Sequence, residues 1–319
     1  MTRKPWSLII KPSTQDFLRA ARRLPGYTLF DLLHGYVYAR WPYLYIGIGV
    51  GEHPLSKRYG PLVVRLVGLF KRPASGNGAS EEKEADRVTF ADGYHGKVMP
   101  LESVKRLVMV GEEITLPDLE QVIPYKRARD LILRNPDHIV ALQCPCRSSR
   151  TDPCLPLDVC LIVGEPFASL VVEHHPERSR WISPGEAAEI LQAEDERGHV
   201  HHAFFKDAML GRFYAICNCC ACCCGAMQAH QRGTPMLASS GYISHVDENL
   251  CIGCAICEDH CQFGALTAPN GTAVVDEERC MGCGVCVNQC DQGALSLERA
   301  PQKGEPLEIL DLMAQVMAG

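Results

Sequence analysis

Eight cysteines near the C-terminal end of the sequence form two runs with the same internal spacing, C-x2-C-x2-C-x3-C. In this spacing the first three thiolates of a run surround one iron–sulfur cluster, and the fourth ligates the other cluster. The sequence therefore predicts two [4Fe–4S] clusters with crossed ligand sets. The first set is Cys251, Cys254, Cys257 and Cys290, and the second set is Cys280, Cys283, Cys286 and Cys261.

The repeat extends beyond the cysteines. The motif Val-Asp-Glu at residues 246–248 recurs at residues 275–277, and Gly-Ala-Leu at residues 264–266 recurs at residues 293–295. Two copies of one unit indicate a pseudo-twofold module with two equivalent metal sites. Structural zinc ions and disulfides are the alternatives, but zinc requires only four cysteines in two pairs, which does not explain two crossed runs.

Residues 244–298 resemble the bacterial dicluster ferredoxins. The resemblance implies a ferredoxin-like (βαβ)2 fold with two short hairpins and two helices, and a function in the transfer of single electrons. Those ferredoxins usually have proline after the fourth cysteine of each run, whereas this chain has Gln262 and Asp291. Ligation does not require the proline, but we expect the packing beside each fourth ligand to differ.

Ten further cysteines lie upstream of this module. Side chains of neighbouring residues diverge, so the six cysteines that crowd into residues 217–224 cannot all ligate one small cluster. We predict that a subset drawn from two groups jointly ligates one or more further iron–sulfur clusters. Buried cysteine without metal is the alternative at any single position. The first group is Cys144, Cys146, Cys154 and Cys160, and the second is Cys217, Cys219, Cys220, Cys222, Cys223 and Cys224.

The order of these motifs is similar to that of a group of ferredoxin-domain proteins from anaerobic bacteria. The similarity covers about residues 117–298 and rests on CPCR at residues 144–147 and on ICNCC and CCG within residues 216–225. It implies a redox role. The CCG motif is also similar to an element of heterodisulfide reductases. No cysteine triplet has the C-x3-C-x2-C spacing of radical S-adenosylmethionine enzymes.

Five histidines lie near the upstream cysteines and could ligate iron or carry protons. Residues 199–202 are interpreted as part of a short polar loop, so we expect their histidines to face solvent. The five are His174, His175, His199, His201 and His202.

Composition indicates the compartment. Eighteen of the 319 residues are cysteine, and 46% of the residues are apolar. The apolar segment at residues 7–10 is too short for a secretory signal, and Pro12 follows it. This many cysteines without export indicates metal in a reducing compartment. We therefore expect a cytoplasmic protein, with membrane association left open, from an organism with anaerobic chemistry.

Charge and apolar patterning single out the N-terminal region. Residues 1–72 contain twelve Lys or Arg against three Asp or Glu, whereas residues 244–299 contain nine acidic residues against two arginines. Residues 36–51 are aromatic and apolar, with a strand-like stretch before their glycines, and residues 54–72 fit a basic amphipathic helix. Residues 36–72 are therefore a candidate surface for peripheral docking on a membrane or a membrane complex. An ordinary helix covering a core is the alternative.

Other classes of ligand have little support. Gly47, Gly49 and Gly51 do not fit the dinucleotide-binding fingerprint, because the third glycine comes one residue too early. We expect no nucleic-acid partner, because no known recognition motif is present.

The predicted fold class is α+β. The predicted units are a basic apolar and aromatic N-terminal region (1–72), a linker (73–87), a mixed α/β cysteine-rich metal-binding domain (88–240), a dicluster [4Fe–4S] ferredoxin domain (241–300) and a C-terminal helix (301–319). Helices are expected at residues 13–25, 117–135, 183–197 and 305–317, and a buried strand at 139–142.

The leading hypothesis is an electron-transfer protein that relays single electrons between a redox donor and a reductase or membrane complex. One alternative is the catalytic subunit of an anaerobic reductase, with a special cluster on the upstream cysteines. A second alternative is an iron–sulfur redox sensor. We expect an electron carrier or an oxidoreductase subunit rather than an autonomous enzyme. The sequence identifies neither the donor nor the acceptor.

Overall fold

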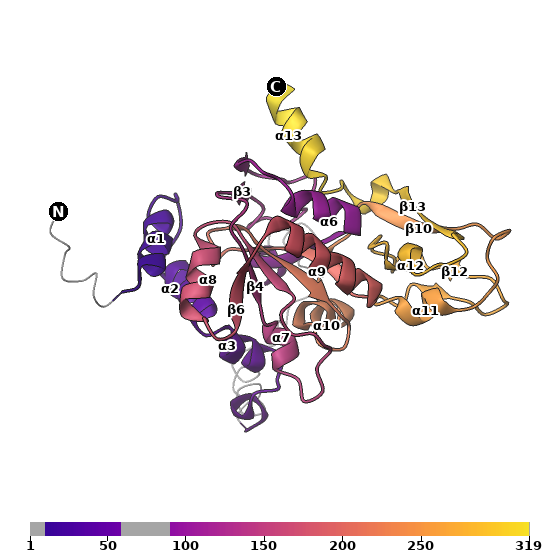
Figure 1. The fold of residues 1–319 in the computed structure, drawn as a ribbon, viewed down its shortest axis with the longest axis horizontal. Coiled ribbons are helices and arrows are strands. Elements are labelled where there is room, and N and C mark those ends of the chain that lie inside the picture. Colours follow the sequence, from indigo (N-terminus) through magenta and orange to yellow (C-terminus); the bar gives the residue numbers. More distant parts are fainter. Residues whose placement is uncertain (1–9, 59–89, 319) are drawn as a thin grey trace, which may run out of the picture.

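The computed structural model describes residues 10–58 and 90–318. At its centre lies a seven-stranded sheet with the strand order β6-β4-β5-β8-β7-β1-β9 (Figure 1). Neighbouring strands run antiparallel except β1 and β9, which are parallel. The strands are β1 (Tyr94–Met99), β4 (Ile139–Leu142), β5 (Cys160–Val163), β6 (Ser179–Ile182), β7 (Val200–Lys206), β8 (Arg212–Cys219) and β9 (Leu237–Ala238).

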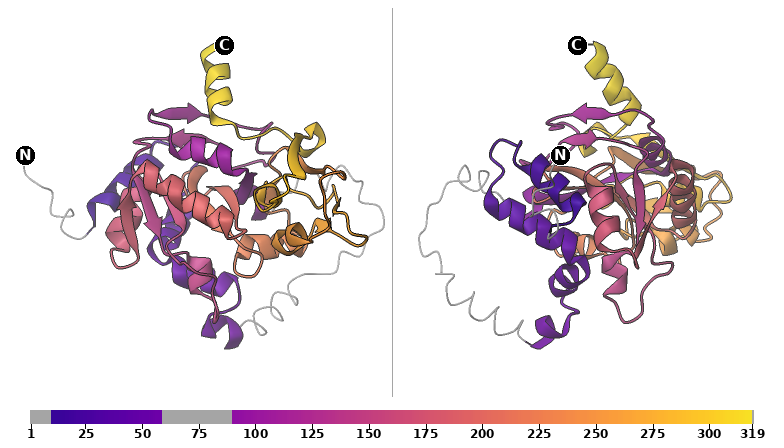
Figure 2. Two further views of the ribbon diagram at one scale, coloured as in Figure 1. Left: turned by 45° about the vertical axis from the view of Figure 1, so that its right-hand side comes forward. Right: turned by 60° about the vertical axis from the view of Figure 1, so that its left-hand side comes forward.

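Helices lie on both faces of this sheet (Figure 1 and Figure 2). Helices α6 and α9 pack on one face against β7, and α2, α3 and α8 lie on the other. The mixed α/β architecture is thereby confirmed. The helices are α1 (Pro12–Ala21), α2 (Leu29–Arg40), α3 (Pro42–Gly49), α5 (Phe90–Gly93), α6 (Leu101–Val108), α7 (Pro145–Ser148), α8 (Phe167–His174), α9 (Pro184–Glu196) and α10 (Gly225–Gln231).

Strands β7 and β8 form the buried middle of the sheet. Cross-strand partners share one face of a sheet, and successive residues alternate between the faces. His201 pairs with Asn218 on the face covered by α9, where the Asp195 carboxylate lies 3.7 Å from the His201 ring. His202 pairs with Cys217 on the opposite face, towards α2 and α3. The alternation of side chains along the strands therefore places His201 and Asn218 on one face of the sheet, and His202 and Cys217 on the other.

The helix predicted over residues 183–197 is confirmed as α9. The Ser183 hydroxyl accepts a hydrogen bond from the Glu186 backbone N–H (3.1 Å), and Pro184 occupies the first turn, where a missing N–H costs nothing. Gly198 follows with φ of 80° and turns the chain into β7. The Glu186 carboxylate accepts from Arg180.

The strand-like interpretation of residues before Gly47 is wrong. Residues 36–51 lie in α2 and α3, which meet at Trp41-Pro42. Thr28 and Asp31 cap α2 reciprocally, and proline at the first position of α3 starts the second helix. The apolar residues of this stretch therefore lie mostly in two half-buried helices rather than in a strand. The helix predicted at 54–72 lies outside the described residues from residue 59 onward. The linker predicted at 73–87 lies entirely outside them.

The first predicted helix is confirmed, with shifted ends. α1 begins at Pro12 rather than Ser13, and Ser13 does not cap it, because its backbone N–H and hydroxyl both bond to the Glu173 carboxylate.

The helix predicted over residues 117–135 is wrong. Residues 117–130 form turns, and the chain then enters β3 (Leu131–Leu133), which pairs with β2 (Ile114–Leu116). Asp118, Ala128 and Asn135 all have positive φ, which a right-handed helix excludes. Most of the apolar residues with helical spacing are instead buried in β3 and in the loop that connects β2 to β3. The buried strand predicted at 139–142 is confirmed as β4.

The C-terminal module adds six short elements to the edge of the body. The strand β10 pairs antiparallel with β13, and β11 with β12. Phe263, Met281 and Val285 belong to the same apolar core as the central sheet, and the Ser240 hydroxyl donates to the Gly282 carbonyl (2.7 Å). The elements are β10 (Tyr242–Val246), α11 (Ile256–His260), β11 (Leu266–Thr267), β12 (Val274–Val275), α12 (Val285–Asn288) and β13 (Leu295–Arg299).

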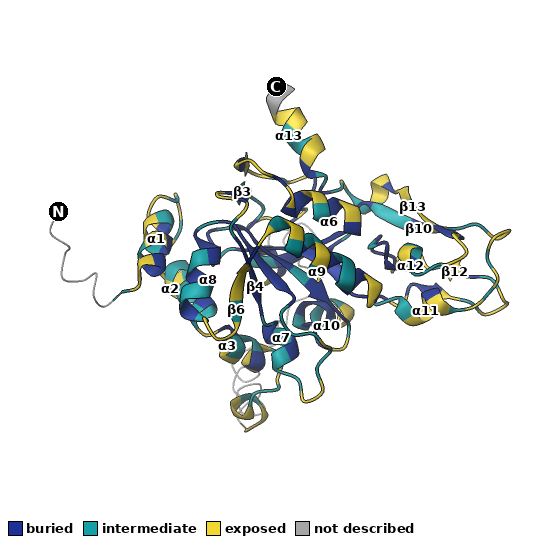
Figure 3. Ribbon diagram, in the orientation of Figure 1, coloured by how far each residue is buried: buried dark blue, intermediate teal, exposed yellow. Residues whose placement is uncertain are grey.

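The last helix, α13 (Ile309–Ala318), begins later than predicted and projects from the body (Figure 3). Ile309 is fully buried, while Leu310 and Val316 are exposed, so the helix is anchored mainly by its first turns against α6 and β2. Among the helices of residues 10–58 and 90–318, none is long and apolar enough to cross a membrane.

Candidate metal centres

Two cavities lie inside the C-terminal module, and four cysteines line each of them. The cavity volumes, which include the space at each mouth, are about 390 Å³ and 360 Å³. The structure brings the first three cysteines of each run together with the fourth cysteine of the other run. The first cavity is lined by Cys251, Cys254, Cys257 and Cys290, and the second by Cys261, Cys280, Cys283 and Cys286.

Two glycines allow the loops to curl around these cavities. Gly253 and Gly282 occupy equivalent positions of the two runs and have φ of 67° and 62°. A Cβ atom on Gly253 would lie 2.2 Å from the carbonyl oxygen of Gly271, and one on Gly282 would lie 2.1 Å from that of Tyr242. Only glycine tolerates both the conformation and the close approach.

Backbone N–H groups point at the sulfur atoms of the module. Ala273 donates to the Cys251 sulfur at 3.3 Å, and Ala265 donates to the Cys261 sulfur at 3.2 Å. Hydrogen bonds to thiolate sulfur tune the reduction potential of a bound cluster. Four thiols around an apolar cavity, with N–H donors aimed at sulfur, fit the requirements of a [4Fe–4S] cluster.

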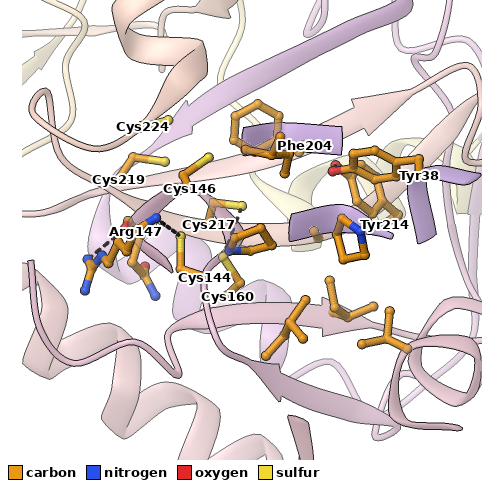
Figure 4. Close-up of a pocket in the computed structure, with 18 of the residues that line it drawn as sticks. Tyr38, Cys144, Cys146, Arg147, Cys160, Phe204, Tyr214, Cys217, Cys219 and Cys224 are labelled. Carbon is orange, nitrogen blue, oxygen red and sulfur yellow. Dashed lines mark hydrogen bonds between the residues drawn. The ribbon is translucent and has the colours of Figure 1, made fainter. Parts of the chain in front are cut away.

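Eight of the ten upstream cysteines line a third pocket beneath α2 and α3, and Figure 4 labels six of them. The side chains of these six converge on this pocket, and the sulfur atoms of Cys160 and Cys217 lie 4.0 Å apart. We call this set the six-cysteine ring. Its members are Cys144, Cys146, Cys160, Cys217, Cys219 and Cys224.

The pocket inside the ring is large and mostly apolar. Its volume, counted like those of the module, is about 800 Å³, roughly twice that of either module cavity. Tyr38 of α2 and Tyr214 of β8 line it, with their hydroxyl groups 2.8 Å apart. Burial raises the pKa of both tyrosines, which keeps them protonated. The Lys206 ammonium lies 4.6 Å from the Tyr38 ring.

A buried ion pair supports the ring from the side of α9. The Arg147 guanidinium donates to Glu194 at 2.5 Å and to the Asn218 carbonyl at 3.0 Å, while the Arg147 backbone N–H donates to the Cys144 sulfur at 3.5 Å. Burial by itself would raise the pKa of Glu194, but the hydrogen bond from His199 and the charge of Arg147 lower it overall. An ionised Glu194 therefore holds Arg147 against the ring.

The expectation of solvent-facing histidines is wrong. His201 and His202 are 1% and 0% exposed, because they lie in the inner strand β7 rather than in a polar loop. The His201 ring contacts the Asn218 side chain at 2.6 Å. Burial lowers the pKa of His202 to about 3, so this ring is neutral. His174 is buried as well, 2.8 Å from the Thr14 hydroxyl.

The other four upstream cysteines form a tighter group at the edge of the ring, which we call the four-cysteine group. All of its sulfur atoms lie within 4.8 Å of one another. Strand β8 ends at Cys219, and in the turn before α10 the sulfur atoms of Cys220, Cys222 and Cys223 gather around that of Cys154, so adjacent cysteines divide between two sites. The members are Cys154, Cys220, Cys222 and Cys223.

Gln262 connects the module to the upstream cysteines. It follows Cys261 at the position where dicluster ferredoxins usually have proline. Its side-chain oxygen accepts from the Ala221 backbone N–H at 2.9 Å, and its amide donates to the Gly198 carbonyl at 3.0 Å. Ala221 lies between two cysteines of the four-cysteine group. The departure from proline was visible in the sequence, but the partner of Gln262 was not.

Comparison with known families identifies the module. Residues 244–267 and 273–296 match the family described as 4Fe-4S binding domain. No curated protein matches the chain. With the four-thiol cavities, this match defines an iron–sulfur protein of ferredoxin type. The protein carries two [4Fe–4S] clusters in its C-terminal module, and its general function is electron transfer.

Removing the charge of Glu194 should destabilise the protein strongly. Glu194→Gln leaves Arg147 buried without a counter-ion, and we expect a loss of about 3–5 kcal/mol in the free energy of unfolding at neutral pH. Because the pKa of Glu194 lies below 4.5, the wild-type contribution is present at neutral pH and is lost as the pH falls below that value. Anaerobic urea unfolding at several pH values measures both effects.

The matched control lies on the same helix. Glu186 pairs with Arg180 at the surface, so Glu186→Gln should cost less than about 1 kcal/mol. Equal losses for the two variants would contradict a supporting role of the buried pair.

Proposed function

We propose that this protein is a multi-cluster electron relay, in which the C-terminal module exchanges single electrons with a further iron–sulfur cluster held by the six-cysteine ring. The observation that carries the proposal is the ring itself, six cysteines, four of them buried, that converge on one pocket beside a ferredoxin module. When bound, iron–sulfur clusters accept and donate one electron at a time. The residues of this chain supply the ligands, the insulation and the contacts between the centres.

The ligand assignment of the module follows the two cavities. Cys251, Cys254, Cys257 and Cys290 are proposed to hold one cluster, and Cys261, Cys280, Cys283 and Cys286 the other. The order β10-α11-β11-β12-α12-β13, with its two strand pairs, supports a ferredoxin-like (βαβ)2 interpretation.

The proposed assignment of the ring rests on its burial and size. The two module cavities give a size for comparison, because each of them fits one [4Fe–4S] cluster with four thiols. The ring offers six thiols and roughly twice the volume. Thiols without metal would gain nothing from such convergence, because a buried cysteine needs only apolar contacts. A cluster with more ligands or more iron than a [4Fe–4S] cluster suits this pocket.

Docking of the module supports transfer into the upstream region. Gln262, next to the ligand Cys261, bonds to the loop that carries the cysteines at 220–224. Asn288 and Gln289 of the module bond to Asp195 at the end of α9. These bonds fix the distance between the module and the upstream thiols, which electron transfer requires.

A redox partner is proposed to approach the first module cavity. Cys254 is exposed, and four apolar side chains beside this cavity face solvent, although the surrounding surface is acidic. A basic partner with an apolar centre would match this surface. The four side chains are Leu250, Ile252, Ile256 and Val274.

A reductase is the second candidate. The specific observation in its favour is the excess volume of the ring pocket and its wall of protonated tyrosines, Tyr38 and Tyr214. Such hydroxyl groups can donate hydrogen bonds or protons to a substrate. An electron relay does not need the tyrosine hydroxyl groups.

The N-terminal helices are proposed to dock the protein on an anionic membrane surface. Leu29, Leu33 and Val37 follow one face of α2 at helical spacing, and all are exposed. Apolar side chains enter the boundary of a bilayer when basic residues flank them, and Arg22, Arg23 and Arg40 do so here. The apolar face continues through Phe30, Trp41, Leu44, Ile48 and Leu55.

Iron content decides whether the ring holds a cluster. Anaerobically purified protein should contain clearly more than the roughly eight irons of two [4Fe–4S] clusters. A Cys160→Ser, Cys217→Ser double variant should fall to about eight and keep the coupled electron paramagnetic resonance (EPR) signal of the reduced module. About eight irons in the wild type would contradict the ring cluster. An unusual additional EPR signal would favour the reductase.

The contact made by Gln262 should affect electron transfer more than stability. Gln262→Ala and Gln289→Ala each remove two side-chain hydrogen bonds between the module and the body, so each should cost about 0.5–1.5 kcal/mol per bond. Freeze-quench EPR after rapid reduction should show slower electron arrival upstream only in Gln262→Ala. Identical rates in the two variants would remove this contact from the path.

Membrane docking should depend on α2. A Phe30→Ser, Leu33→Ser double variant should bind vesicles of anionic lipid at least about tenfold more weakly, since each large apolar side chain contributes roughly 1.5–3 kcal/mol when buried. Co-sedimentation measures the change, with Leu310→Ser as the matched exposed leucine. Undiminished binding of the double variant would sink the proposal, and so would failure of the wild type to bind.

A further inference from the structure

We propose that the four-cysteine group is a mononuclear metal centre, separate from every iron–sulfur cluster of the protein. One tetrahedral ion would be bound by four thiolates. The ligands are Cys154, Cys220, Cys222 and Cys223. This assignment does not depend on what the six-cysteine ring holds.

The distances between the sulfur atoms carry the inference. The Cys154 and Cys222 sulfurs are 3.2 Å apart, the Cys222 and Cys223 sulfurs are 3.6 Å apart, and no pair in the group exceeds 4.8 Å. A single ion with metal–sulfur bonds of about 2.3 Å in a tetrahedron places its ligands about 3.8 Å apart. The two shortest distances lie slightly below that value, and no pair of sulfur atoms exceeds it by more than about 1.0 Å.

The cysteines around the two module cavities are spaced differently from the four-cysteine group. A [4Fe–4S] cluster binds each cysteine through a different iron atom, so its four thiolates stand around a cage. Among residues 10–58 and 90–318, no other group of three or more His, Cys, Asp or Glu side chains has all its ligand atoms within 4.8 Å. The cysteine sets around the two module cavities are therefore wider than the four-cysteine group.

The four-cysteine group joins two segments without regular secondary structure, as structural metal sites do. Residues 149–159, which supply Cys154, contain no helix or strand, and the other ligands come from the turn between β8 and α10. Arg150 donates to the Cys223 carbonyl at 3.0 Å, and Gln228 donates to the Cys222 carbonyl at 2.8 Å. The Arg150 bond already links the Cys154 loop to the turn, but no regular structure joins the two segments. A shared ion would add a second link at the thiols.

The centre would also close one wall of the ring pocket. Cys220 and Cys223 contribute to the lining of that pocket as well as to the four-cysteine group. Four thiolates fill a tetrahedral ion completely, which leaves no position for substrate. Zinc and a single iron share this chemistry, and the closed, loop-stapling arrangement is the one that structural zinc sites use.

Metal analysis with X-ray absorption spectroscopy tests the proposal on the intact, anaerobically purified protein. We expect one zinc per chain with four sulfur neighbours at about 2.3 Å. A single non-cluster iron with the same neighbours, seen by its high-spin EPR signal after oxidation, supports the mononuclear centre and replaces zinc as its metal. Both readouts use the wild type and therefore do not depend on the folding of a variant.

Variants separate this centre from the clusters. Cys154→Ser and Cys222→Ser should each lose the single ion and keep the reduced-module EPR signal, and both positions are partly exposed, so a serine there tolerates solvent. Cys160→Ser, in the ring, should keep the ion. Loss of several irons together from Cys222→Ser, nitrogen or oxygen neighbours at the zinc, or no metal beyond the clusters would each overturn the proposal.

Discussion

The pairing of β7 with β8 is the constraint on which the arrangement of the upstream cysteines depends. Thiolates that share a metal must converge, and a strand sends every second side chain to the same face. Cys217 and Cys219 therefore reach the pocket together, while the side chain of Asn218 between them contacts His201. After the end of β8 the side chains no longer alternate between two faces, and Cys220, Cys222 and Cys223 belong to the four-cysteine group.

Burial of these thiols requires matching polar support. Arg147 follows Cys146 directly, and Glu194 neutralises its buried charge, which would otherwise be costly inside the protein. The pair is held by His199 and by the Asn218 carbonyl, so α7, α9, β7 and β8 are connected through one buried network. The same helix, α9, bonds through Asp195 to the ferredoxin module. One helix thus sets the position of the ring and of the module.

The module differs from an independent ferredoxin in the way it is attached. Its residues Phe263, Met281 and Val285 extend the apolar core of the central sheet, and Gln262 replaces a proline by a side chain with two partners. Proline could not make those bonds, because it has neither a side-chain donor nor an acceptor. The substitution that weakens the resemblance to free ferredoxins is the one that joins the clusters to the rest of the chain.

The sequence by itself determined the metal chemistry of residues 251–290, because the spacing of eight cysteines encodes local loops. It also determined α9 and β4, whose caps and burial are local signals. It could not predict the loop at 117–130, where residues with positive φ override helical spacing, nor the buried histidines of β7. Only the tertiary structure divided the ten upstream cysteines into a ring of six and a group of four, because that division depends on strand pairing between segments far apart in the chain.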